Sequence, residues 1–351
     1  MASASPSSMH SGGPSSLVTG ATGFLGRHLV RSLVEHGHTV TALGRQCPNL
    51  VTPSGVRYQY GDILNQRCLA DATRNVSVVY HLAAIVPGKG GQAEQWRVNH
   101  YGTRVLLQAC IENGVKRLVF LSSVCAYAPP LKALLDEDSP TGGGDSYGQS
   151  KAAAELEIAN AATNSLSSVI LRPSQVYGPG DGGFTAMLVS MLSGKYLYTA
   201  GRSPRPFSLV YVDDLIEAIV RAGTSRAIGS DTLNIAGPPT HLQALTSAYA
   251  AITGHEAKCV PLPIAVVRLA QELRWFSRNL SGNAMRPRWK SYAADQVYGS
   301  VLLGGPEYSV NRAKLALAFE AKTSIQKGLA NVLNSHSHDS SVNSNVLNNP
   351  H

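Results

Sequence analysis

The chain has 351 residues, of which 44% are hydrophobic and 15% charged, so it can bury a core and form one large domain with an appended lobe, or two domains. Its formal charge of +8 is mild for this length, and without a nucleic-acid-binding motif it suits an anionic cofactor better than a nucleic acid. No run approaches the roughly 18 consecutive apolar residues that a membrane span needs.

The two ends of the chain have compositions typical of disorder. Residues 1–14 are rich in Ser, Gly and Pro and lack the basic start and apolar centre of a secretion signal, so we expect a disordered extension. Residues 334–351 are rich in Asn, Ser and His and predict a disordered tail. The five cysteines form no C-x-x-C pair, which favours reduced thiols in the cytoplasm and predicts no metal site.

Three glycines spaced three apart, Gly20, Gly23 and Gly26, organise the first part of the chain between a short strand at 16–18 and a helix at 27–37. The first permits a sharp turn, the second leaves room for a pyrophosphate, and the third lets the helix pack close to the strand. Because the N-terminus of that helix would face the phosphates, the pattern predicts dinucleotide binding. We expect contacts from these glycines and from Thr22, Phe24 and Leu25.

The end of the second expected strand, residues 39–43, indicates which dinucleotide binds. An acidic residue there binds the ribose 2′-hydroxyl of NAD, whereas an arginine accommodates the 2′-phosphate of NADP. No acid is present and Arg45 follows, so we predict NADP(H), with NAD(H) as the alternative. Arg45 could also be no more than a solvated loop charge.

The next two strands place further residues near a cofactor. Residues 56–60 predict a strand followed by Asp62, positioned to meet the adenine amino group, and by Ile63. Residues 76–82 predict another strand, whose tip needs small residues where it passes beneath the ribose and phosphates. His81 at this tip is interpreted as a packed core histidine. The expected contacts are Leu82, Ala83 and Ala84.

Strands and helices continue to alternate along the chain. Residues 96–113 predict a long helix with Asn99 early in it, and apolar runs at 117–122 and 169–171 predict strands that are covered on both faces. This alternation is typical of a parallel, doubly wound sheet and predicts an α/β fold.

The composition changes at residues 178–183, a glycine-rich stretch that predicts a hinge between two lobes. Beyond it we expect a helix at 184–192, a strand at 207–212 that returns to the first lobe, and a helix capped by Asp213. The predicted division is a nucleotide-binding domain at 15–180 joined by 207–235, and a smaller C-terminal substrate-binding α/β lobe formed by 181–206 and 236–333.

Tyr147 and Lys151 stand four residues apart on an expected helix and therefore share one face. A free tyrosine has a pKa of about 10, and a nearby ammonium would lower that pKa toward the working range. Tyr147 could then move a hydroxyl proton while hydride moves to or from nicotinamide C4, with Ser123 holding the substrate oxygen. The alternative, a surface Tyr–Lys pair, is disfavoured by the phosphate loop and the strand-end serine.

Several motifs spaced along the chain occur together in one superfamily. They are T-G-x-x-G-x-x-G from Thr19, H-L-A-A from His81, N-H-Y-G-T from Asn99, S-S-x-x-x-Y from Ser122, Y-x-x-x-K from Tyr147, L-R-P-S-Q-V-Y-G-P-G-D from Leu171 and V-Y-V-D-D from Val210. Their combination, over residues 16–332, resembles the extended short-chain dehydrogenase/reductase superfamily, in particular its epimerase/dehydratase and 3β-hydroxysteroid dehydrogenase-like branches.

The resemblance implies a Rossmann sheet with strand order 3-2-1-4-5-6-7 and a homodimer formed through helices at 102–112 and 147–162. The second helix is alanine-rich, which suits close packing, although helix propensity alone also explains it. The resemblance further implies Ser123, Tyr147 and Lys151 as catalytic residues with Asn99 in support, and cofactor contacts from Ser122, Tyr147, Lys151, Pro173, Ser174 and Val176.

At two positions the sequence differs from motifs of particular branches of the superfamily, which limits the reactions we expect. Dehydratases resemble Thr-Asp-Glu at the serine position, where this chain has Val124 and Cys125 after Ser123, so that chemistry lacks its acid. Sugar-nucleotide enzymes commonly place an arginine five residues before the Val of V-D-D, where this chain has Phe207. Arg202 or Arg205 could substitute, so the sugar-nucleotide reading is weakened and not excluded.

The run 260–270, followed by Trp275 and Phe276, resembles the sterol branch, where it covers an apolar substrate. An ordinary amphipathic core helix explains the run equally well. The arginines within 268–290 permit loose contact with an anionic membrane surface, which we disfavour.

We therefore predict an NAD(P)-dependent oxidoreductase that interconverts a secondary alcohol and a ketone on a mid-sized, partly apolar hydroxy or keto substrate, similar to 3β-hydroxysteroid dehydrogenases and dihydroflavonol reductases, with NADPH-linked reduction favoured. The alternative is an NDP-sugar 4-epimerase with tightly bound NAD. A third possibility, a catalytically silent NAD(P)-sensing protein, is disfavoured because such relatives usually lose the tyrosine or the lysine.

Overall fold

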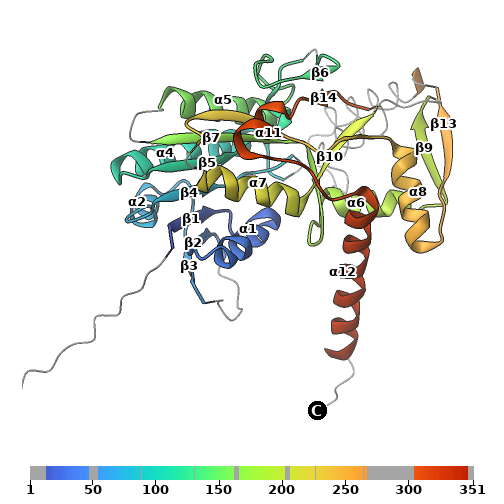
Figure 1. The fold of residues 1–351 in the computed structure, drawn as a ribbon, viewed down its shortest axis with the longest axis horizontal. Helices are drawn as coiled ribbons and strands as arrows, with labels where there is room; N and C mark the ends of the chain where they lie inside the picture. Colours follow the sequence, from blue (N-terminus) through green and yellow to red (C-terminus); the bar gives the residue numbers. More distant parts are fainter. Residues whose placement is uncertain are drawn as a thin grey trace, which may run out of the picture.

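A seven-stranded parallel sheet forms the centre of the molecule, with helices on both faces (Figure 1). The computed structural model describes residues 13–46, 54–87, 89–129, 131–161, 166–201, 206–225, 227–263, 265–266 and 304–346. The expected extension before residue 13 and the 268–290 segment lie outside the described residues.

The order of strands in this sheet confirms the predicted 3-2-1-4-5-6-7 arrangement when its strands are counted along the chain. Every neighbouring pair is parallel. In sheet order the strands are β3 (Val56–Tyr60), β2 (Thr39–Gly44), β1 (Ser15–Thr19), β4 (Val78–His81), β5 (Arg117–Leu121), β7 (Ser167–Pro173) and β11 (Asp231–Ile235).

Side chains of the strands alternate between two apolar cores, because successive residues of a strand point to opposite faces. Val18 and Tyr80 belong to one core, whereas their neighbours Leu17 and Val79 belong to the other. The strands are therefore almost continuously apolar, as expected for a sheet that is covered on both faces. The first core packs under α1 (Phe24–Glu35) and α7 (Val212–Thr224), and the second under α2 (Gln66–Ala72), α4 (Gly102–Glu112) and α5 (Ser146–Asn160).

The helix predicted at 96–113 is interrupted by a wider turn. A short α3 (Gln92–Gln95) leads into a π-helical segment η1 (Trp96–Tyr101), which continues directly as α4. A π-helical turn accommodates one extra residue and is frequent at functional sites, and a hydrophobic pattern alone does not reveal it. Asn99 lies within η1 and is fully buried.

The strand predicted to return to the first lobe joins a separate sheet instead. β10 (Phe207–Tyr211) pairs in parallel with β8 (Gln175–Tyr177) and antiparallel with β12 (Pro239–Thr240). The place beside β7 in the central sheet is taken by β11, so the chain returns through α7 and β11. Asp213 lies in the first turn of α7 rather than at its N-cap, which is Tyr211, and its charge there still favours the helix N-terminus.

The second lobe is built from short elements around these strands. β9 (Tyr196–Ala200) pairs in parallel with β13 (Lys258–Leu262), and β14 (Glu307–Tyr308) pairs in parallel with β6 (Leu134–Leu135). The later helices in the described ranges are α6 (Phe184–Leu192), α8 (Leu242–Thr253), α11 (Asn311–Leu317) and α12 (Ile325–Val346), of which α11 packs against α7 and β11 of the central sheet.

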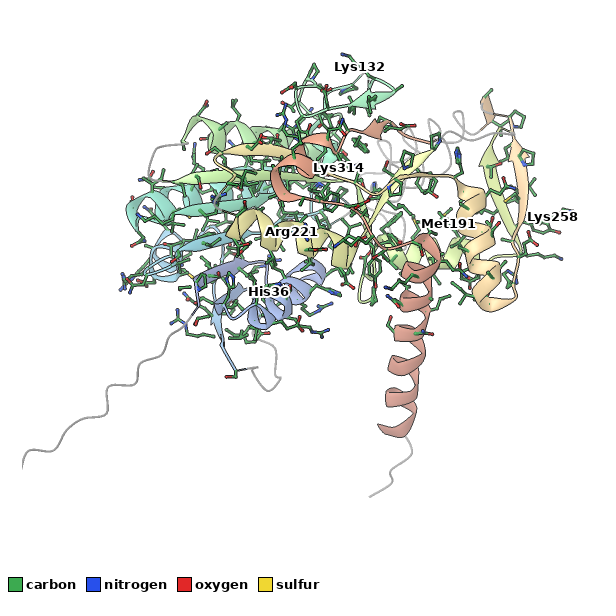
Figure 2. The ribbon with its side chains drawn as sticks, viewed as in Figure 1. His36, Lys132, Met191, Arg221, Lys258 and Lys314 are labelled. Atoms are coloured by element: carbon green, nitrogen blue, oxygen red, sulfur yellow. The ribbon has the colours of Figure 1, made fainter. Side chains whose placement is uncertain are left out.

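The end of the chain differs from the expected disordered tail. The α12 backbone is helical through Val346 and projects from the body of the molecule (Figure 1). Leu329 and Val332 are fully buried and anchor the helix, and no Gly or Pro follows Gly328 before Val346 to end it. Met191 of α6, labelled in Figure 2, belongs to the same apolar core as Leu329. None of the described helices is both long and apolar enough for a membrane span.

Candidate active site

The carboxyl ends of β1, β4 and β5 meet at one edge of the sheet because the strands are parallel. Gly20 follows β1 with a φ of +70°, and a Cβ there would lie 2.8 Å from the backbone nitrogen of Ala83, just beyond β4. The glycine loop therefore packs directly against the tip of β4. Ser122 and Ser123 follow β5 at the same edge.

The glycine loop has the shape expected of a phosphate cradle. A Cβ on Gly26 would lie 2.2 Å from the Gly20 carbonyl oxygen, so the helix and the loop are in close contact. A Cβ on Gly23 would meet that same oxygen at 3.2 Å and no other described atom within 4 Å, which leaves one side of the loop open. Gly23 is the N-cap of α1, and none of the described side chains caps the helix there. These features fit the phosphates of a dinucleotide.

The side chains of the other loop residues make contacts within the protein. Leu25 packs on the core, and Phe24 contacts His28 edge-on at 5.5 Å between ring centroids. The Thr22 side chain lies beside Gly44 at the end of β2. Arg45 follows directly and is exposed.

Of the cofactor contacts predicted after β3 and β7, some side chains are partly exposed and others are buried in the protein. Asp62 is half-buried, and its carboxylate accepts a hydrogen bond from the Leu64 N–H at 2.9 Å. The Ile63 side chain is buried in the core against α4. Pro173 ends β7, the buried Ser174 donates its N–H to the Ile235 carbonyl at 2.9 Å, and Val176 lies in β8.

The side chains of Ser123 and Tyr147 lie close to each other. The Ser123 hydroxyl accepts the Cys125 N–H at 3.1 Å, and its proximity to the Tyr147 phenol lowers the pKa of that phenol. Asp145 is the N-cap of α5, and its carboxylate accepts the Gly148 N–H at 2.7 Å. The cap fixes the start of the helix, so Tyr147 lies in its first turn. Tyr147 is 9% exposed, whereas Ser123 is half-buried.

The protonation of Tyr147 differs from the expectation of a lowered pKa. Burial raises the pKa of the phenol well above its usual value, and Cys125 and Asp145 raise it further, against a lowering by the nearby Ser123 hydroxyl. The Lys151 ammonium is directed at β5, where it donates to the Leu121 carbonyl at 2.7 Å. In this arrangement Tyr147 is a protonated phenol that can donate.

Lys151 is deeply buried, at 2% exposure, and its Nζ lies 4.6 Å from the centre of the Phe120 ring. Burial lowers the pKa of Lys151 to about 7, and Glu155, one turn further along α5, raises it. The charge of Lys151 therefore depends on its surroundings within the physiological pH range.

Asn99 connects three segments at the back of the site. Its Oδ1 accepts the Ile85 N–H at 2.7 Å, and its Nδ2 donates to the Ile85 carbonyl at 3.0 Å and to the Ser150 hydroxyl at 3.0 Å. Ser150 in turn donates to the Tyr147 carbonyl at 2.8 Å. The Asn99 amide thus holds the loop after β4 against α5, which fits the supporting role implied for it.

His81 is part of this network and is fully buried. Its Nδ1 lies 2.7 Å from the Thr19 hydroxyl, and its Nε2 lies 2.9 Å from the Thr103 hydroxyl. Thr103 donates its proton to the Asn99 carbonyl at 2.6 Å, so Nε2 carries the imidazole proton and Nδ1 accepts from Thr19. Burial, and then the Lys151 charge, lower the pKa of His81 to about 3, so the ring is neutral.

Sequence reasoning missed a buried carboxylate in this region. Glu155 is 5% exposed, accepts a hydrogen bond from the Ser122 hydroxyl, and pairs with Arg172 at 2.6 Å. The Ser122 side chain, expected at the cofactor, is therefore engaged by α5. A charged residue four positions after Lys151 in an alanine-rich buried helix was the available signal.

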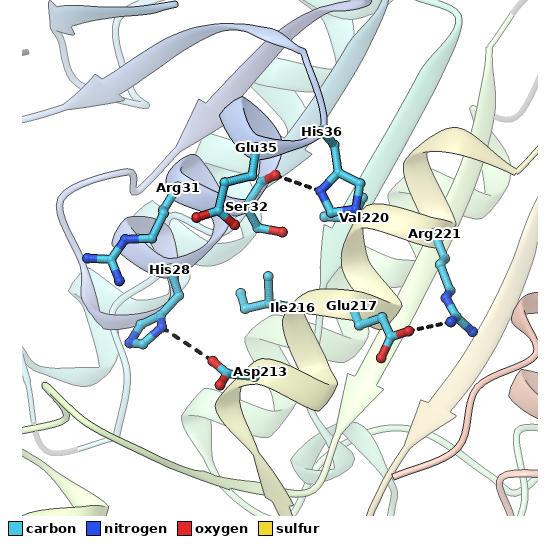
Figure 3. A pocket seen from close by; sticks show the side chains of 10 residues that line it. All are labelled: His28, Arg31, Ser32, Glu35, His36, Asp213, Ile216, Glu217, Val220 and Arg221. Carbon is cyan, nitrogen blue, oxygen red and sulfur yellow. Dashed lines mark hydrogen bonds and ion pairs between the residues drawn. The ribbon is translucent and has the colours of Figure 1, made fainter. Parts of the chain in front are cut away.

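A separate surface pocket of about 430 Å³ lies between α1 and α7 (Figure 3). His28 faces Asp213 across it at 3.7 Å, and Glu217 pairs with Arg221 along α7. None of the predicted site residues lines this pocket. Within the described ranges, no three His, Cys, Asp or Glu side chains are grouped to hold a metal.

Comparison with known proteins agrees with this geometry. Residues 16–236 match the model of the NAD dependent epimerase/dehydratase family. The chain is 29% identical to sterol demethylase protein B of Methylococcus capsulatus, over 75% of this chain and 83% of that protein. It is 31% identical to 3beta-hydroxysteroid-dehydrogenase/decarboxylase isoform 1 of Arabidopsis thaliana over 61% of this chain, and so spans about half of that relative, 54%.

Among solved structures, the chain is similar to MoeE5 in complex with UDP-glucose and NAD, with a TM-score of 0.70 and 28% identity. The match covers 93% of this chain and 99% of MoeE5. It therefore extends beyond the nucleotide-binding sheet into the second lobe.

His81 predicts a pH dependence of stability. Because the folded-state pKa of about 3 lies below the ordinary 6.5, the unfolded chain binds an extra proton between these pH values, and stability is lost as the pH falls. This histidine should contribute a fall of about 1.4 kcal/mol in the free energy of unfolding per pH unit. In denaturant titrations from pH 7 to pH 4, His81→Asn should have a shallower pH slope than the wild type. The exposed His241→Asn should keep the wild-type slope, and equal slopes for all three proteins would contradict the assignment.

Proposed function

The chain belongs to the NAD dependent epimerase/dehydratase family, and from this premise we propose that it is an NAD(P)-dependent oxidoreductase interconverting a secondary alcohol and a ketone. The observation that carries the proposal is the proximity of the Ser123 and Tyr147 hydroxyls, at the sheet edge that also holds the glycine loop. Two hydroxyls at this point can together hold and protonate one substrate oxygen.

Each residue has a distinct part in this scheme. Nicotinamide dinucleotide, when bound, supplies or accepts the hydride. Ser123 holds the substrate oxygen, and Tyr147 donates a proton to it during reduction or removes one during oxidation. The raised pKa of Tyr147 keeps the phenol protonated at neutral pH, which favours reduction of a ketone. The Lys151 ammonium supplies positive charge beneath the site, held by the Leu121 carbonyl.

The substrate class is argued from the residues next to Ser123 and from the relatives. Val124 and Cys125 offer no carboxylic acid for elimination of water, which disfavours dehydration. Two relatives bear names of sterol chemistry, and one of them is matched over most of its length. We therefore place a mid-sized, partly apolar hydroxy or keto compound in the site.

The long match to MoeE5 with UDP-glucose supports a second candidate, an NDP-sugar 4-epimerase that retains NAD. The two functions differ in what is consumed. An epimerase would turn over UDP-glucose without net use of added NADPH, whereas a reductase would consume NADPH in step with a ketone.

Replacement of Tyr147 tests the proton relay. Tyr147→Phe should lower kcat by at least about 100-fold for a steroid or alkyl ketone, because the proton donor is lost. Binding of NADPH, followed by its fluorescence, should be retained. Tyr196→Phe, at a 48% exposed tyrosine on β9, should have wild-type kcat. Full turnover by Tyr147→Phe would refute the proposed mechanism.

We also propose NADP(H) as the preferred cofactor, because the exposed Arg45 follows β2 directly and no acidic residue occupies that place. The wild type should have a higher kcat/KM with NADPH than with NADH. Arg45→Asp should lower the NADPH-to-NADH ratio of kcat/KM at least about 10-fold, because a charge-assisted contact with the 2′-phosphate is replaced by repulsion. Arg31→Asp, an exposed arginine on α1, is the matched control, and an unchanged ratio in Arg45→Asp would argue for NAD(H).

We propose a homodimer formed through η1, α4 and α5. Trp96, Tyr101 and Leu156 are 38%, 44% and 62% exposed on η1 and α5, and His100 joins these elements by pairing with Glu157 at 3.2 Å. Large apolar side chains gathered on one exposed face are typical of an interface. A second copy of the chain would cover them.

A charge placed on this face should separate the two subunits. Leu156→Glu is expected to change a dimer into a monomer in light scattering after size exclusion, because it would bury an unpaired carboxylate. Leu315→Glu, at a leucine that is 90% exposed on α11, should remain dimeric. A wild type that is monomeric at all concentrations, or a dimeric Leu156→Glu, would contradict this interface.

A further inference from the structure

A buried ion pair lies directly behind the catalytic helix. Glu155 on α5 and Arg172 on β7 are each 5% exposed. The Arg172 Nη2 donates to Glu155 Oε2 at 2.6 Å, and its Nε donates to the two carboxylate oxygens at 3.1 and 3.2 Å. This fork holds the carboxylate in one orientation.

The same carboxylate is tied to the end of β5. The Ser122 hydroxyl donates to Glu155 Oε1, and the Ser122 N–H donates to the Leu171 carbonyl at 2.8 Å. Ser122 immediately precedes Ser123, and Glu155 stands one helical turn after Lys151. The carboxylate is therefore bonded to the residue that precedes Ser123 and stands one helical turn from Lys151.

Arg172 is itself fixed on its other sides. Its Nη1 donates to the Glu137 carbonyl at 3.2 Å, and the guanidinium lies 4.8 Å from the centre of the Tyr127 ring. The Tyr127 hydroxyl donates to Asn234 at 2.7 Å. Arg172 therefore holds the Glu155 carboxylate from a fixed position.

Stability alone is a weak reason for this pair, since desolvation of two buried charges often costs as much as their attraction returns. Its place suggests another reason. Lys151 faces the His81 imidazole from β4, the Leu121 carbonyl and Phe120 ring from β5, and Glu155 on its own helix. Of these, the imidazole is neutral, so Glu155 is the carboxylate that balances the lysine charge.

We propose that Glu155 is a positioning residue that keeps Lys151 charged and in place, with Ser122 and Arg172 holding its carboxylate. The inference rests on the proposed role of Lys151 in the site. Glu155 touches no reacting atom in this account and acts through the lysine. Removal of its charge leaves burial unopposed, so the pKa of Lys151 should fall below the present value of about 7.

The test is the pH dependence of cofactor binding, which needs no substrate. NADPH binding to the full chain is followed by fluorescence from pH 5.5 to pH 9.5. The wild type should lose affinity as Lys151 is deprotonated, and Lys151→Met should remove this alkaline limb, which assigns the limb to the lysine. Glu155→Gln should move the limb to lower pH by about one unit. Glu155→Asp, which keeps the charge, should restore most of the wild-type position.

Two further variants separate this role from a structural one. Glu157→Gln, two residues along the same helix and more exposed, should leave the limb in place. If Glu155→Gln does not fold, Glu155→Leu combined with Arg172→Met removes both buried charges, an exchange that is often tolerated. We expect the alkaline loss of NADPH affinity to occur at lower pH in that double variant than in the wild type. A wild-type limb in a folded Glu155→Gln or double variant would overturn it, independently of whether Tyr147→Phe retains turnover.

Discussion

The two ring nitrogens of His81 hold the catalytic edge of the sheet together. On one side the Thr19 hydroxyl, which also accepts the Ala83 N–H at 3.2 Å, connects the imidazole to the end of β1. On the other side Thr103 connects it to the carbonyl of Asn99 in the π-helical turn. Every proton in this series has a single assignment, because each hydroxyl gives its proton onward. The phosphate loop, the β4 tip and the catalytic helix thus share one rigid support.

Burial in this region shifts the pKa values of Tyr147 and Lys151 in opposite directions. In the proposed mechanism Tyr147 donates a proton to the substrate oxygen, and burial raises the pKa of the phenol. The same mechanism uses a charged Lys151, and burial lowers the pKa of the ammonium. The raised pKa of Tyr147 by itself suits a proton donor. To keep Lys151 charged against the effect of burial, a nearby carboxylate is needed, and Glu155, held by Arg172, can provide it.

Much of the site followed from the sequence because local spacing determines it. Three glycines between a strand and a helix fix the phosphate loop, and a tyrosine following a strand-end serine in a parallel sheet must approach the same edge. The π-helical turn could not be predicted, because an extra residue in one turn leaves the apolar pattern nearly unchanged. Nor could the partner of β10, since its apolar run fits either sheet. The Tyr147 pKa was expected to fall because of the positive charges of Lys151 and an oxidised nicotinamide, whereas in the structure the loss of solvent has the largest effect and raises it.

The π-helical turn also limits how the length of this segment can change during evolution or engineering. Deletion of one residue from η1 would restore regular helical geometry, which is locally favourable. The helix on either side would keep its orientation, because the wide turn absorbs the extra residue, and the residues of the turn itself would shift. Asn99 lies in that turn, so its side chain would move away from Ile85, and the buried amide and carbonyl of that loop would lose their partners. Insertions and deletions should accordingly be far less tolerated here than substitutions at its exposed Trp96 or Tyr101.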